Sequence, residues 1–215
     1  GDGNKIDAQY NSSITTKKSL SPGYLIQSIG AGGGRSAVKG IDMETIYLGG
    51  IGSASGSGGD ITLASTGTIN TAGRYSHGMI LQTLGGGGGY TSTDDAIQTS
   101  YALRSGNSGN GGNLSVTQTG SINVDGFETH GVILQSVGGG GGIIDGVFMG
   151  SAQGNGDSGN IDFIMDGDLK VSNTRSHGIF AQSKAPKGTQ GDISLELSSN
   201  HLIDTNPTGV SVYFS

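Results

Sequence analysis

Short stretches in which apolar and polar residues alternate recur along the chain. In each stretch two apolar residues lie two positions apart, so they share one face of an extended strand. A second short strand follows and carries one inward apolar residue. The first-strand pairs are Ile6/Ala8, Ile61/Leu63, Leu114/Val116, Ile161/Phe163 and Ile193/Leu195. The second-strand residues are Ile14, Ile69, Ile122, Leu169 and Leu202.

A turn separates these two strands in the inner copies of the pattern. It carries Thr66-Gly67, Thr119-Gly120 or Asp166-Gly167. Glycine adopts positive φ at low steric cost, so we expect a turn of that kind at each of these positions.

A third strand begins at a glycine that opens a repeated phrase. The spacings of this glycine are 78−23=55, 131−78=53 and 178−131=47 residues. Repetition of this kind predicts stacked structural units. The copies of the phrase are SPGYLIQSIGAGGG (21–34), SHGMILQTLGGGGG (76–89), THGVILQSVGGGGG (129–142) and SHGIFAQSKAPKG (176–188).

Three strands joined by tight turns and repeated with like residues at like positions are typical of one coil of a parallel β-helix. We therefore predict an all-β fold, a parallel β-helix (β-solenoid) of about five coils with glycine-rich excursions. The chain would form a single unit over residues 1–215. The expected repeat units are 4–58, 59–111, 112–158, 159–190 and 191–215.

The third strand is apolar on both faces. One face carries Met79 and Leu81, and the other carries Ile80 and Leu84. A strand that is apolar on both sides is usually covered on both sides. The coil interior covers one side, and we expect the segment after the phrase to cover the other. These excursions are residues 30–58, 85–111 and 138–158.

Each excursion opens with a glycine run, as at Gly85–Gly89 and Gly138–Gly142. One interpretation is close stacking across coils, which leaves no room for Cβ atoms; the other is a flexible linker. The fourth copy favours close stacking. It has no excursion, its glycines become Lys184-Ala185-Pro186-Lys187, and its outward face turns polar at Lys184.

Composition narrows the class of protein. The chain has 44 Gly but only three Pro and no strict G-X-Y period, which excludes collagen. A net charge of −6 disfavours nucleic acid as the partner. No apolar stretch approaches the length of a membrane span. The sequence shows no leader, so we expect a mature chain or an excised piece. The absence of Cys is compatible with any compartment.

The phrase, preceded by Ser-His or Thr-His and by a Gly-Gly-Asp/Asn strand, resembles the glycine-rich repeats of bacterial autotransporter passenger domains. The resemblance covers nearly all of residues 1–215. It implies a surface-exposed or released right-handed β-helix, exported across the outer membrane of a Gram-negative bacterium, ahead of a translocator. It implies no catalytic residues. The first and fourth copies depart most from the pattern, through Pro22 and the lost glycines.

Three histidines, His77, His130 and His177, occupy one position of consecutive copies and are expected to stack. Such a ladder could bind a divalent metal or act as a proton switch. A turn residue bonded to its neighbour is the favoured interpretation. Pro22 replaces the histidine in the first copy, and a linear stack offers no convergent ligand geometry. We therefore predict no metal site and no cofactor.

Two further polar columns are read as structural. Stacked amides hydrogen-bond along the axis, and Asx side chains cap turns. The Gly-Gly-Asp/Asn stretches are similar to the repeats of calcium-binding β-rolls. They do not recur every nine residues as those repeats do, which disfavours calcium binding. The amide column is Gln27, Gln82, Gln135 and Gln182, and the Asx column is Asp60, Asn113, Asn160 and Asp192.

Carboxylates are concentrated only at Asp94-Asp95 and at Asp162, Asp166 and Asp168. Polysaccharide-active β-helices need convergent carboxylates near a groove. None of these groups recurs with a basic partner, so we predict that the chain is not an enzyme and has no catalytic residues.

The function predicted from these observations is structural and adhesive. The chain would be a rigid segment of a secreted bacterial surface protein that presents binding surfaces to cells, matrix or glycans. Self-association through the coil ends is a further expectation. The alternatives are a polysaccharide-active enzyme (lyase or hydrolase) and a phage tail or fibre segment.

Overall fold

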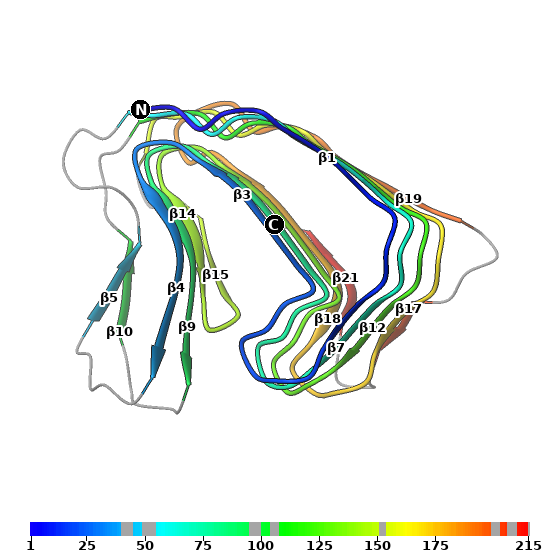
Figure 1. The fold of residues 1–215 in the computed structure, drawn as a ribbon. Helices are drawn as coiled ribbons and strands as arrows, with labels where there is room; N and C mark the ends of the chain where they lie inside the picture. Colours follow the sequence, from blue (N-terminus) through cyan, green and yellow to red (C-terminus); the bar gives the residue numbers. More distant parts are fainter. Residues whose placement is uncertain are drawn as a thin grey trace.

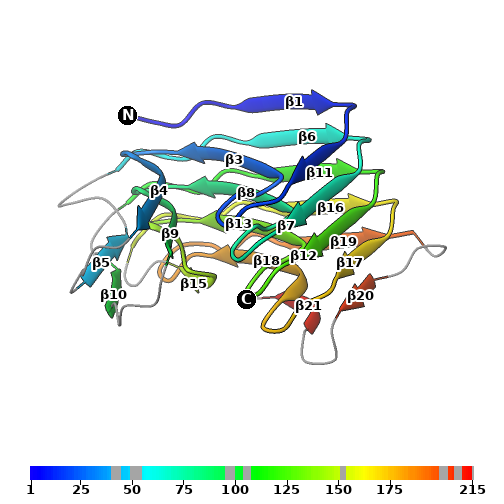
Figure 2. The same ribbon diagram turned by 60° about the horizontal axis from the view of Figure 1, so that its bottom comes forward.

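The computed structural model describes residues 1–39, 45–48, 55–94, 100–103, 108–150, 154–198, 203–205 and 210–214. Every regular element in these ranges is a β-strand. The described part of the chain therefore contains no helix long and apolar enough to span a bilayer. The strands stack in layers along one axis, with the N-terminal and C-terminal windings at opposite ends (Figure 2).

Three parallel sheets of five strands form the coil, one strand per winding in each sheet. Sheet A contains β1 (Ile6–Tyr10), β6 (Ile61–Ser65), β11 (Leu114–Gln118), β16 (Ile161–Met165) and β19 (Ile193–Leu197). Sheet B contains β2 (Ile14–Thr16), β7 (Ile69–Ala72), β12 (Ile122–Asp125), β17 (Leu169–Val171) and β20 (Ile203–Thr205). Sheet C contains β3 (Tyr24–Ile29), β8 (Met79–Leu84), β13 (Val132–Val137), β18 (His177–Lys184) and β21 (Val210–Phe214).

The windings have one hand. Figure 1 looks along the axis with the blue N-terminal winding nearest, and the chain runs clockwise as it recedes through sheets A, B and C. That sense is right-handed, as expected for parallel strands joined by crossovers. The predicted parallel β-helix of about five coils is confirmed.

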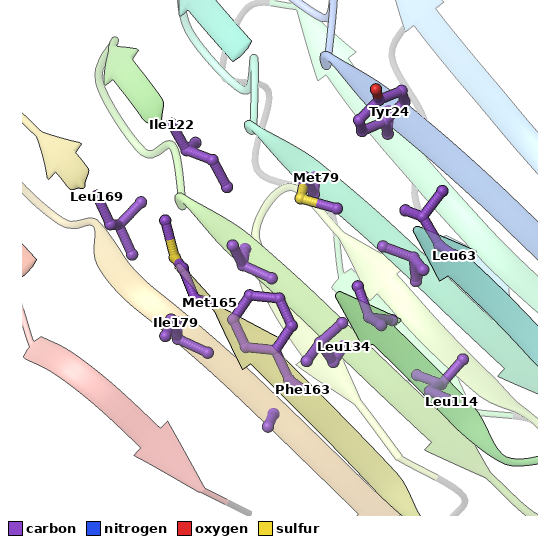
Figure 3. Packing of buried hydrophobic residues seen from close by; sticks show 14 of the residues in the cluster. Tyr24, Leu63, Met79, Leu114, Ile122, Leu134, Phe163, Met165, Leu169 and Ile179 are labelled. Atoms are coloured by element: carbon purple, nitrogen blue, oxygen red, sulfur yellow. The ribbon is translucent and has the colours of Figure 1, made fainter. Parts of the chain in front are cut away.

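The core fills the space between sheets A, B and C. Equivalent residues are register partners, so Ile69 pairs with Ile122 and Ile122 pairs with Leu169. All three are fully buried, and Figure 3 shows Ile122 and Leu169 turned toward the same interior as Phe163. Alternation in sheet A places its apolar pairs here too. These inward columns are as predicted.

One inward residue was assigned wrongly. Leu169 pairs with Ile203, and Ile203 packs against the core, so it takes the place predicted for Leu202. Leu202 itself lies outside the described residues. Between Met165 and Leu169 the chain needs three residues, but between the equivalent Leu197 and Ile203 it has five, so the turn of the last winding is longer.

A fourth sheet lies against sheet C on the side away from the core (Figure 1). Sheet D contains β4 (Gly33–Lys39), β9 (Gly88–Asp94), β14 (Gly141–Ile144) and the antiparallel β15 (Val147–Met149). A separate parallel pair consists of β5 (Thr45–Leu48) and β10 (Ser100–Leu103).

Sheet D covers the outer face of sheet C. Ile80 and Ile133 point away from the main core and form a second buried cluster with Tyr90 and Ile143 from sheet D. In the fourth winding Phe180 is buried under Phe148 of β15, which stacks on its ring. The prediction that the third strand is covered on both faces by the excursions is confirmed.

The glycine runs are closely stacked. A Cβ atom on Gly88 would lie 1.8 Å from the carbonyl oxygen of Gly141, and one on Gly89 would lie 1.9 Å from that of Gly34. No side chain fits at such distances, and both residues have positive φ. The stacking interpretation of the runs is therefore confirmed over the linker interpretation.

The turn glycines between the first two strands are required for a different physical reason from the one predicted. Gly67, Gly120 and Gly167 do not adopt the expected positive φ. A Cβ on Gly67 would lie 1.8 Å from the carbonyl oxygen of Ser12 in the preceding winding. Glycine is required there because backbones of successive coils approach closely, and the expected left-handed turn is wrong.

Candidate functional site

The predicted amide column runs along the layer between sheets C and D. Gln27 donates to Gln82, Gln82 to Gln135 and Gln135 to Gln182, each over 2.7 Å from Nε2 to Oε1. The Nε2 of Gln135 also donates to the carbonyl of Gly142 at 3.2 Å. The column thus connects neighbouring windings and holds sheet D to sheet C, which confirms its structural interpretation.

The three histidines stack as predicted at the start of the sheet C strands. Ring centroids lie 5.1 Å apart for His77 and His130 and 5.0 Å apart for His130 and His177. The backbone N–H of His130 donates to Nδ1 of His77 at 2.9 Å, and that of His177 donates to Nδ1 of His130 at the same distance. An Nδ1 that accepts carries no proton, so the neutral ring holds its proton on Nε2.

Burial sets the charge of this column. It lowers the pKa of His77 to about 3. Burial also lowers the pKa of His130 well below its usual value, helped by the neighbouring His77 and His177. Burial lowers the pKa of His177 as well. The stack is therefore neutral at pH 7.

The same geometry disfavours a shared metal ion. Parallel rings about 5 Å apart separate like nitrogens by more than two Zn–N bonds of roughly 2.1 Å can span. In the described parts of the chain no group of three or more His, Cys, Asp or Glu is placed to hold a metal. The bond between each histidine and its neighbour confirms the turn-residue interpretation.

The Asx column caps the start of sheet A. The Oδ1 of Asp60 accepts the backbone N–H of Asn113 at 2.7 Å, and Asn113 and Asn160 repeat the contact one winding on. A parallel column three residues earlier, which the sequence reasoning missed, does the same through Asn110 and Asp157. These side-chain oxygens are used for backbone donors, so their interpretation as caps is confirmed.

A hydroxyl column was also missed. Thr83 donates to the carbonyl of Gly59 at 3.0 Å and accepts the N–H of Gly112 at 2.7 Å, and Ser136 repeats this with Gly112 and Gly159. The sequence contains a signal for this column, because a hydroxyl residue directly follows each glutamine of the amide column. These residues are Ser28, Thr83, Ser136 and Ser183.

A charged cluster joins the turns that lead into sheet C. Glu128 accepts from Arg74 at 2.8 Å and from Arg175 at 3.3 Å. Burial opposes ionisation of Glu128, but hydrogen bonds from Arg74, Tyr75 and Arg175 outweigh it and lower the pKa of this carboxyl. Both guanidinium groups also lie within 6 Å of the Phe127 ring.

A shallow groove of about 230 Å³ crosses the windings at sheet B. Thr15, Asn70 and Asn123 are register partners on the side of the strands opposite the core residues. Asn123 donates to Asn70 at 3.0 Å. Lys17 and Asp125 add one charge of each sign to the lining. The accessible lining of the groove is mostly apolar, and Thr15, Asn70 and Asn123 add a row of hydrogen-bonding groups with one charge of each sign beside it.

The described carboxylates of the predicted concentrations are exposed at sheet A and in the turn that follows it. Asp162 lies on the outer face of sheet A, and Asp166 and Asp168 lie in the following turn, all exposed. Asp95 lies outside the described residues, and of Asp94 only the backbone is described.

Comparisons of the chain with protein-family models, with curated proteins and with solved structures give no match.

Proposed function

We propose that this chain is a structural and adhesive segment of a secreted bacterial surface protein, a stiff rod that presents repeated binding surfaces to glycans, matrix or cells. The observation that carries the proposal is the continuity of its polar columns. Glutamine, histidine, Asx and hydroxyl side chains each bond to the next winding, so four ladders together join the second and third windings.

Those ladders support a mechanical role. The backbone pairs of sheets A, B and C and the side-chain columns all run along the axis. A pull along that axis is therefore resisted by the backbone pairs and the side-chain columns together. Activities on such repeat scaffolds vary with the surfaces they display.

The sheet B groove is the surface we assign to ligand contact. Parallel strands repeat about every 4.8 Å, so equivalent groups of Thr15, Asn70 and Asn123 form a row suited to an extended polar chain. A glycan meets these requirements, since its hydroxyl groups donate and accept along its length. Repetition of weak contacts would raise avidity.

A glycan array run in parallel with turnover assays on acidic polysaccharides tests the proposal. We expect retention of a glycan without cleavage, and at least a tenfold weaker interaction for Asn70→Leu with Asn123→Leu. Ser115→Ala, on the exposed face of sheet A, is the matched control and should bind normally. Product release on turnover, or full binding by the double variant, would refute the adhesive groove.

A further inference from the structure

The first winding leaves an open edge on sheets C and D. Gly32, just before β4, is exposed, whereas its equivalents Gly87 and Gly140 are buried. Gly33 at the start of β4 is exposed too, whereas its register partner Gly88 is half-buried. In sheet C, Leu25 is only partly buried, although its partners further along the stack are fully buried. Backbone and apolar groups that are covered in the inner windings are thus accessible here.

Glycines of successive windings interlock in a fixed pattern along sheet D. The first glycine of each pair would direct a Cβ at the carbonyl of the next winding, at 1.9 Å from Gly33 to Gly88. The second would direct a Cβ at the carbonyl of the preceding winding, at 1.9 Å from Gly89 to Gly34 and 2.0 Å from Gly142 to Gly89.

This pattern ends at Gly34. Its φ of +137° matches the +143° of Gly89, yet a Cβ on Gly34 would meet nothing within 4 Å. The space that the carbonyl of a preceding strand fills elsewhere is therefore open. A strand that occupied it would need glycine at its own first position, because its Cβ would otherwise strike the carbonyl of Gly33.

The glutamine column ends at the same edge with a defined polarity. Each glutamine donates through Nε2 to the following winding and accepts through Oε1 from the preceding one. Gln27 donates to Gln82, so its Oε1 is turned toward the open side of the stack. In three windings the glutamine precedes the interlocked glycine pair by six residues: Gln27 and Gly33, Gln82 and Gly88, Gln135 and Gly141.

We propose that the edge formed by β3 and β4 is a docking site for a parallel extended segment of the form Gln-x5-Gly-Gly. The glutamine extends the amide column, and the two glycines continue the interlock at Gly33 and Gly34. The partner is thus a glycine-rich β-strand segment, which fits because its glycines have no Cβ atom to strike the neighbouring carbonyl groups.

The opposite end of sheet D differs. There β15 runs antiparallel to β14, and the fourth winding carries Lys184-Ala185-Pro186-Lys187 in place of the glycines. Docking of the proposed kind therefore has a direction, and the described last winding of a second copy does not supply the segment.

A labelled peptide with the sequence of residues 76–92, SHGMILQTLGGGGGYTS, tests the site on the intact chain. We expect saturable binding by fluorescence anisotropy, with slower amide exchange confined to β3 and β4. Alanine in place of both glycines that correspond to Gly88 and Gly89 should weaken binding at least tenfold. On the chain, Gly34→Ala should do the same, whereas Val147→Ala at the far end should leave binding unchanged.

Absence of binding, or equal binding by the alanine peptide, would overturn the proposal, as would exchange protection at the opposite end of the stack. If Gly34→Ala lowers thermal stability, the proposal is tested by the unmodified chain alone, by comparing its binding of the original peptide with its binding of the alanine peptide. This inference does not depend on the adhesive function, since the peptide assay contains no glycan.

Discussion

The backbone N–H of His130 donates to Nδ1 of His77 at 2.9 Å, with the two rings parallel to within 3°. The bond requires a neutral acceptor nitrogen, because a protonated imidazole has no lone pair left at Nδ1. Protonation of His77 would therefore place a buried charge beside the ring of His130 and remove a bond between two windings.

This relationship predicts loss of stability in mild acid. The pKa of His77 is lowered to about 3 in the fold, against about 6.5 in the unfolded chain. Stability from the neutral ring is complete above pH 6.5 and is lost as the pH falls from 6.5 toward 3. Denaturant unfolding at pH 7 and pH 5 should differ by about 2 kcal/mol from His77, and the lowered pKa of His130 adds a loss of the same sign.

The double variant His77→Asn with His130→Asn should show a much smaller difference between pH 7 and pH 5. Glu128 contributes little between these two pH values, because the stability from its lowered pKa is lost only as the pH falls below the unfolded value of 4.5. An unchanged pH dependence in the variant would mean that the histidine column does not control acid stability.

Glycine stacking predicts an asymmetric response to one methyl group. Gly34 and Gly89 have nearly the same φ, so alanine adds similar backbone strain at both, about 1–3 kcal/mol. Only Gly89→Ala also forces a Cβ against a carbonyl, so it should be at least 2 kcal/mol more destabilising. Thermal unfolding of the two variants makes the comparison, and equal losses would argue against packed glycine strands.

The cover over the fourth winding gives another test. Phe148 packs on Phe180 and contacts the His130 ring, whereas its neighbour Val147 is 48% exposed. Phe148→Ala should cost about 2–3 kcal/mol of unfolding free energy, since the phenylalanine is only partly buried. Val147→Ala should change it by less than about 0.5 kcal/mol. Similar values for both would show that β15 contributes no cover.

The inward column predicts severe damage from a buried charge. Ile122 is fully buried between Ile69 and Leu169, so Ile122→Asp leaves a carboxylate without a partner in the core. We expect loss of the β circular dichroism signal or a strongly lowered melting temperature. The exposed Ser115→Asp is the control, and native behaviour of both variants would refute the assignment of the column.

Much of the fold could be predicted from sequence because a strand with one buried face has a period of two. The inward pair Ile61 and Leu63 and the two-sided strand with Met79 and Ile80 are visible in that pattern. The side-chain columns could be predicted equally well, since residues that repeat at one position must lie above one another in a solenoid. This reasoning placed the histidine and glutamine ladders.

Other features have no such signal. Leu20, Tyr75, Glu128 and Arg175 share one position and adopt positive φ, a conformation that their residue types disfavour. The turn before sheet C imposes it, and composition does not reveal it. The slip from Leu202 to Ile203 has a similar cause, because both residues are apolar and only the length of the preceding turn distinguishes them.

Cysteine cross-linking tests most directly whether successive windings lie in register. The chain has no native Cys, and Thr62 and Ser115 are register partners on the outer face of sheet A. Their Cα atoms should be about 4.8 Å apart, within disulfide range, whereas Thr62 and Thr117 should be about 8 Å apart, beyond it. We predict that Thr62→Cys with Ser115→Cys forms a disulfide readily and that Thr62→Cys with Thr117→Cys does not. Equal cross-linking of the two pairs, or preference for the second, would contradict the stacked coil.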